Sequence, residues 1–82
     1  MLSLKTISKY EPTMKKLKVS EVARSPRGFL TAYKKAGNSK RLSPKWKQKR
    51  NAFIARHNAQ YRKHPTQRRK LALIAWAYNP DS

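Results

Sequence analysis

The amino-acid sequence predicts an all-α protein, in which one compact three-helix domain follows a basic, largely irregular N-terminal arm. Prolines beside hydroxyl side chains divide the chain at helix starts, and the apolar residues between them recur at helical spacing. Two Trp, four Tyr and two Phe in 82 residues are enough for one small core. We therefore expect an arm over residues 1–24 and a domain over residues 25–82, with helices at about 26–36, 44–63 and 67–78.

The first predicted helix begins at Ser25-Pro26, where a capping hydroxyl precedes a proline at the first helical position. Gly37-Asn38 supplies a left-handed stop. One face of this helix is apolar and is expected in the core; it carries Phe29, Leu30, Tyr33 and Ala36. Lys34 and Lys35 fall on the polar side and are expected to contact phosphate.

The second predicted helix begins at Ser43-Pro44 and has two distinct sides. Its apolar side carries Trp46, Phe53, His57 and Tyr61. Arg50 projects into this side, so we expect it to extend outward, stack on Trp46 or contact a partner.

A row of cations lies on another stripe of the same helix. At 100° per residue, its members fall within about 40° of one another; they are Lys45, Lys49, Arg56 and Lys63. Ala52 and Ala59 flank the row. A solvated helix face usually mixes signs to form Glu–Lys pairs four residues apart, and this helix contains no acidic residue. We therefore favour phosphate binding over a simple solvated face.

The third predicted helix starts at the cap Thr66 and stops before Asn79-Pro80. Residues 71–78 are apolar on nearly all sides, which predicts a central helix or self-association through Leu73 and Trp76. Its first turn carries the three cations Arg68, Arg69 and Lys70. Free N–H groups beside these cations predict an anion-binding spot, and a solubilising flank is the alternative.

The charge balance indicates a polyanionic partner. The formal net charge is +18, and Val22 to Pro80 contains sixteen of the 21 Lys and Arg but no acidic residue. Such a segment repels itself, and nucleic acid is the commonest partner that supplies the missing negative charge. The lysines of the arm are expected to gain order when this partner binds.

Several function classes receive no support from the residues. The predicted domain has no carboxylate before Asp81 and no cysteine, and His57 and His64 stand seven residues apart. We therefore expect no enzyme activity, no cofactor and no metal site. The longest apolar run is the eight residues Leu71–Tyr78, so no membrane span is expected. No apolar signal-peptide core follows Met1, so a non-secreted protein is expected. The net charge would also suit binding to an anionic membrane surface.

Three tracts of the chain resemble a small uncharacterised domain of bacteriophages (cyanophage-like) and other DNA viruses. They are the run 25–33, the residues Trp46, Arg50, Phe53, Arg56 and His57, and the tract 65–78. The resemblance covers about 25–80 and has no settled activity attached to it. It implies a viral origin, with action in a virion or in the cytoplasm of an infected cell, associated with the nucleoid.

Together these observations predict a non-enzymatic nucleic-acid-binding protein that contacts phosphates with low sequence specificity, and DNA is favoured over RNA. The predicted contacts are Lys34, Lys35, Lys45, Lys49, Arg56, Lys63, Arg68, Arg69 and Lys70. Three alternatives stay open. They are a virion structural or cement-like protein facing acidic capsid protein or genome, a small viral modulator of an acidic host protein, and an RNA- or ribosome-binding protein.

Overall fold

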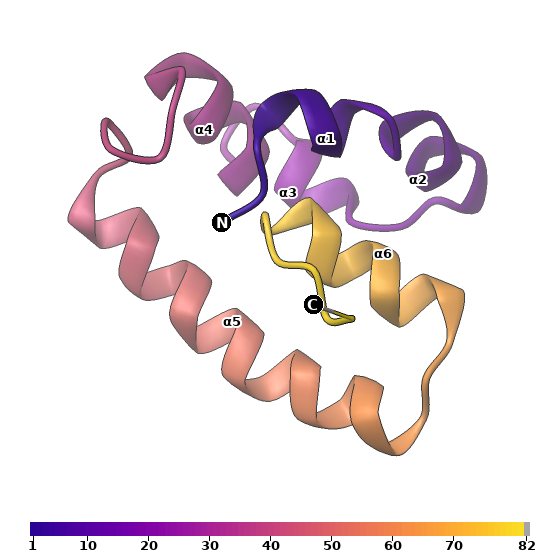
Figure 1. Cartoon of the computed structure of the whole chain (residues 1–82). Coiled ribbons are helices and arrows are strands. Elements are labelled where there is room, and N and C mark those ends of the chain that lie inside the picture. The colour runs from indigo at the N-terminus through magenta and orange to yellow at the C-terminus, as the bar shows by residue number, and fades with distance from the viewer. Residues whose placement is uncertain (82) are drawn as a thin grey trace.

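The computed structural model describes residues 1–81 and shows six helical segments around one core, with no strand in that part of the chain (Figure 1). About 65% of the chain is helical, which confirms the all-α class. The segments are α1 (Leu4–Ser8), α2 (Glu11–Leu17), α3 (Glu21–Arg24), α4 (Phe29–Ala36), α5 (Pro44–Lys63) and α6 (Gln67–Ala75). The predicted three-helix arrangement is not confirmed, because three short helices precede α4.

The expectation of an irregular N-terminal arm is wrong. Residues of α1 to α3 and their connections belong to the core, where Ile7 and Met14 have no exposed surface and Val19 is buried. α2 packs against α6, and the backbone N–H of Leu2 donates a hydrogen bond of 2.8 Å to the carbonyl of Ala77. The physical reason is that α6 is apolar on nearly all sides and needs a cover on the side that α5 does not reach.

α4 begins three residues later than predicted. The hydroxyl of Ser25 donates to the carbonyl of Val22 and so closes α3, while Gly28 is the residue that precedes α4. A Cβ on Gly28 would lie 2.1 Å from the carbonyl oxygen of Val22, so only glycine fits where α3 meets the start of α4. The predicted stop is confirmed, since Gly37 ends α4 with φ 85°.

The predicted starts of α5 and α6 are both confirmed. The Ser43 hydroxyl accepts a hydrogen bond from the N–H of Trp46, and the Thr66 hydroxyl accepts one from the N–H of Arg69. α5 covers residues 44–63, as predicted, and Pro44 occupies its first turn.

α6 ends at Ala75 instead of continuing to residue 78. Ala77 takes the left-handed conformation with φ 61°, and its N–H donates to Ile74 while the N–H of Tyr78 donates to Leu73. This pair of bonds is a Schellman motif, in which glycine is the usual left-handed residue. The side chain of Arg50 donates to the carbonyls of Trp76 and Ala77, each at 2.8 Å, so α5 binds the backbone where α6 stops.

An aromatic cluster joins α4, α5 and the end of α6. Trp76 stacks on Phe29 and on Phe53 with ring centroids 4.9 and 4.5 Å apart, and Phe53 stacks on His57 at 3.9 Å. Leu73 has no exposed surface. The predicted self-association surface of Leu73 and Trp76 is therefore wrong: one residue is fully buried and the other is stacked within the chain.

We predict that Ile7→Ala lowers the free energy of unfolding by about 2–5 kcal/mol, the usual cost of truncating a fully buried Ile. Urea denaturation followed by circular dichroism measures this. Lys9→Ala, at an exposed position just after α1, is the matched control and should change stability by less than about 0.5 kcal/mol. Equal stability of Ile7→Ala and the wild type would contradict the placement of α1 in the core.

We predict that Arg50→Ala destabilises the fold by about 2–4 kcal/mol, because hydrogen bonds to charged groups contribute about 1.5–3 kcal/mol each. Arg56→Ala removes an exposed cation from the same helix and should be nearly neutral. The comparison uses the same denaturation measurement. If the two variants lose the same stability, Arg50 does not hold the end of α6.

Candidate nucleic-acid interface

Four exposed cations form a row along the outer face of α5, which we call the basic ridge: Lys45, Lys49, Arg56 and Lys63. Figure 1 shows α5 running along one side of the molecule, with the other helices on one flank of it only. None of the 20 residues of α5 is fully buried. The helix therefore presents an accessible face along its whole length.

The inner face of α5 fixes the direction of the basic ridge. Trp46, Arg50, Phe53 and His57 are half-buried against α4 and the end of α6. At 100° per residue, the mean direction of the ridge lies roughly 95° around the helix from the mean direction of these inward residues, so the ridge runs beside the inner face on the exposed side. Small exposed side chains separate the cations on the outer face: Ala52, Ala55 and Ala59.

The basic ridge carries uncompensated charge. α5 contains no acidic residue, and the two ion pairs within residues 1–81 join Lys34 to Glu11 and Lys70 to Asp81. From Lys45 to Lys63 the ridge extends about 27 Å at a rise of 1.5 Å per residue. The ridge is thus a line of positive charge almost as long as the molecule, whose longest extent is 33 Å.

One member of the basic ridge has a defined side-chain contact. The ammonium group of Lys49 lies 4.9 Å from the centroid of the Trp46 ring, a cation–π contact. The contact keeps the aliphatic stem of Lys49 close to α5 and places a cation beside an aromatic surface.

The second predicted contact, at the start of α6, differs in its geometry from the basic ridge. Arg68 donates to the carbonyl of Leu17, and Arg69 donates to the carbonyl of His64 at 3.2 Å. Lys70 pairs with Asp81 at 2.7 Å; this hydrogen bond lowers the pKa of the Asp81 carboxyl and raises the pKa of the Lys70 ammonium. All three cations therefore have partners within the chain: Arg68 joins α6 to α2, Arg69 binds the residue that ends α5, and Lys70 joins α6 to the C-terminal segment.

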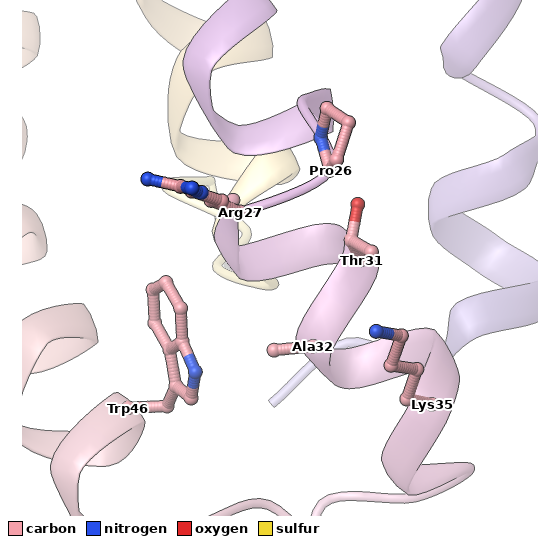
Figure 2. Close-up of a pocket in the computed structure, with 7 residues that line it drawn as sticks. Pro26, Arg27, Thr31, Ala32, Lys35 and Trp46 are labelled. Atoms are coloured by element: carbon pink, nitrogen blue, oxygen red, sulfur yellow. The ribbon is translucent and has the colours of Figure 1, made fainter.

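The two predicted contacts on α4 are separated by the fold. Lys34 pairs with Glu11 at 2.8 Å and so joins α4 to α2. Lys35 is exposed and lies beside a cavity near the start of α5 (Figure 2). The structure thus brings Lys35, but not Lys34, toward the helix that carries the basic ridge.

Sequence reasoning missed two residues at this cavity, Arg27 and Trp46. Trp46 was placed only on the apolar side of the second predicted helix, and Arg27 was given no contact with a ligand. Both line the cavity together with Lys35. No local signal could have identified them as a group, because they come from segments that only tertiary packing brings together.

His57 is a titratable ring that stacks on Phe53 in the aromatic cluster. Burial lowers the pKa of His57, and the neighbouring charge of Arg56 lowers it further. The neutral imidazole is therefore favoured in the folded state, whereas in the unfolded chain its pKa is near 6.5. This difference in pKa stabilises the folded state fully at pH values above about 6.5. The stabilisation is lost as the pH falls toward the lowered pKa of His57 in the folded state.

We predict that the free energy of unfolding falls between pH of about 7 and pH of about 5, and that His57→Gln reduces this fall. Denaturant titrations at several pH values measure it. His64→Gln, which removes the exposed histidine after α5, is the control and should keep the wild-type pH dependence. An unchanged slope in His57→Gln would contradict the sign derived for His57.

Two further features bear on the choice of function. No helix within the described residues is both long and apolar enough to cross a bilayer. Nor do three His, Asp or Glu side chains meet as metal ligands anywhere in residues 1–81. Comparison with protein-family models, curated proteins and solved structures finds no significant match to this chain.

Proposed function

We propose that the protein is a non-enzymatic nucleic-acid-binding protein that holds DNA mainly through its phosphates. The observation that carries this proposal is the basic ridge. Its four exposed cations lie on one face of a 20-residue helix without acidic residues, and none forms an ion pair within residues 1–81. Each phosphate contact releases counterions, and this release drives binding without regard to base sequence.

The shape of α5 suits a groove of duplex DNA. A helix with its side chains is about 10–12 Å across, and the major groove of B-DNA is about 12 Å wide. The exposed alanines between the cations allow close approach of the helix backbone. The ridge cations would then reach phosphates at the groove edges while the inner face of α5 keeps its contacts with α4 and α6.

Low sequence specificity follows from the side chains that α5 offers to bases. Asn58 is half-buried, and its amide donates toward the hydroxyl of Tyr78, so it is turned away from the ridge. Base readout in the major groove relies on Arg, Asn, Gln and similar groups that reach base edges. After Pro44, the exposed side chains of α5 are alanines, six cations and the three amides Gln48, Asn51 and Gln60. Because cations outnumber the groups that read base edges, phosphate contacts dominate and specificity is low.

The viral resemblance of residues 25–80 supports a place of action in a virion or in the nucleoid of an infected cell. In that setting a small cationic protein with low specificity would coat or compact the genome. RNA or an acidic protein would meet the same charge, and the binding experiment below separates them by the polymer preferred.

We predict that binding to a mixed-sequence DNA duplex falls steeply with salt, with a log–log slope near −5 for about six phosphate contacts. Replacing the four ridge cations with Gln should reduce the magnitude of this slope by about 3–4. Fluorescence anisotropy on duplex DNA, single-stranded DNA and duplex RNA measures both effects.

The matched control removes the same charge from α1, α2 and the turn between them, through the exposed residues Lys5, Lys9, Lys15 and Lys16, each changed to Gln. This control should change the slope by less than about 1. An equal effect of the two quadruple variants would mean that net charge, not the ridge, governs binding. Weak binding to all three polymers would instead indicate an acidic protein partner.

A further inference from the structure

A cavity of about 280 Å³ opens between the start of α4 and the first turn of α5 (Figure 2). The segment that precedes α4 forms one side of it, and α5 forms the other. Its lining residues are Pro26, Arg27, Gly28, Thr31, Ala32, Lys35 and Trp46. This cavity is separate from the basic ridge but adjoins it, because Lys45 and Lys49 flank Trp46 on α5.

The lining combines two cations with one aromatic surface and no carboxylate. Arg27 and Lys35 are exposed, and neither forms an ion pair with any residue in 1–81. Figure 2 shows the ammonium group of Lys35 turned toward Ala32. The hydroxyl of Thr31 already donates to the carbonyl of Ser25 at 2.6 Å, so the polar side-chain groups left for a ligand at this site are the two cations and the indole N–H of Trp46.

The ring of Trp46 is held in place by contacts within the chain and forms one side of the cavity. Its ring contacts Phe29 edge-on, with centroids 6.1 Å apart, and the ammonium of Lys49 lies over the ring. Yet Trp46 is only half-buried, which leaves part of the indole surface accessible at the cavity. A rigid aromatic surface beside two cations matches a planar ring that carries a phosphate.

The size of the cavity limits what it can take. At about 280 Å³ the cavity lies just below the range of about 300–1,000 Å³ typical of ligand pockets, so it takes one base at most and is too small for a base pair. Two of the lining residues, Gly28 and Ala32, are small, and Ala32 lies between Trp46 and Lys35 (Figure 2). A strand that follows the basic ridge passes Lys45 and Lys49, on either side of Trp46.

We propose that this cavity binds one unpaired nucleotide of a DNA strand lying on the basic ridge. The base lies against Trp46, and the backbone phosphates on its two sides contact Arg27 and Lys35, whose side chains lie on opposite sides of Ala32 (Figure 2). This proposal rests on the proposed function, and it adds a preference that charge alone does not produce: nucleic acid with an extrahelical base is bound more tightly than a perfect duplex. Stacking of one base on an aromatic side chain supplies the difference.

The test compares two DNA duplexes of the same sequence, one with a single bulged thymidine and one with an abasic residue at the bulge. The wild-type chain should bind the thymidine bulge at least about fivefold more tightly, the lower end of what one base–aromatic stack contributes. The double variant Arg27→Gln/Lys35→Gln should lose most of this ratio. Trp46→Leu should lose it too, provided that its circular dichroism spectrum matches the wild type.

The control Lys40→Gln/Arg41→Gln removes the same charge from the exposed loop before α5, outside the cavity, and should keep the full ratio. A wild-type ratio near one, with tight binding to both duplexes, overturns the cavity proposal and leaves the proposed function standing. The same conclusion follows if Arg27→Gln/Lys35→Gln keeps the ratio. Absence of binding to either duplex overturns both proposals.

Discussion

The contact between the Arg50 guanidinium and the backbone at the end of α6 is the interaction on which the rest of the structure depends. Its two hydrogen bonds, each 2.8 Å, reach the carbonyls of Trp76 and Ala77. The carbonyl end of a helix is the negative end of its dipole, so a cation is well placed there. Because Arg50 lies on the inner face of α5, this contact fixes the rotation of the helix and leaves the basic ridge, roughly 95° around the helix from that face, exposed.

The same contact organises the aromatic cluster and the chain ends. With the backbone held after Ala75, Trp76 lies where it stacks on both Phe29 and Phe53. The carbonyl of Ala77 also accepts the N–H of Leu2, and the carbonyl of Leu2 accepts the hydroxyl of Tyr33. Thus a chain with a formal charge of +18 uses one cation of α5 to close its core and leaves the ridge cations for a partner.

The parts of the fold that local signals specify were predictable from the sequence. Ser43 and Thr66 cap α5 and α6 where the sequence indicated, because a capping hydroxyl acts within one turn. The basic ridge was predictable for the same reason, since helical spacing alone places its four cations together. The end of α6 was not predictable from local signals, because Arg50, which binds the backbone there, lies 26 residues before Trp76.

The N-terminal helices and the partners of the α6 cations were also not predictable from the sequence. Helices as short as α1 to α3 have no repeat to detect and are stabilised by tertiary packing, not by their own propensity. The cations Arg68 and Lys70 find partners at Leu17 and Asp81, which only the complete fold brings near. The cavity beside Trp46 is a third case, because its two cations lie on a segment remote from α5 in the sequence.

The most direct test of the central claim is a map of the surface that duplex DNA contacts, obtained by NMR titration of the isotope-labelled chain. If the outer face of α5 is the interface, the largest shift changes will fall at the basic ridge and at Ala52 and Ala59 between its members. Residues of α1 and α2 will then change little. Shift changes centred on α1 and α2, with α5 unaffected, would contradict the assignment of the basic ridge as the binding surface.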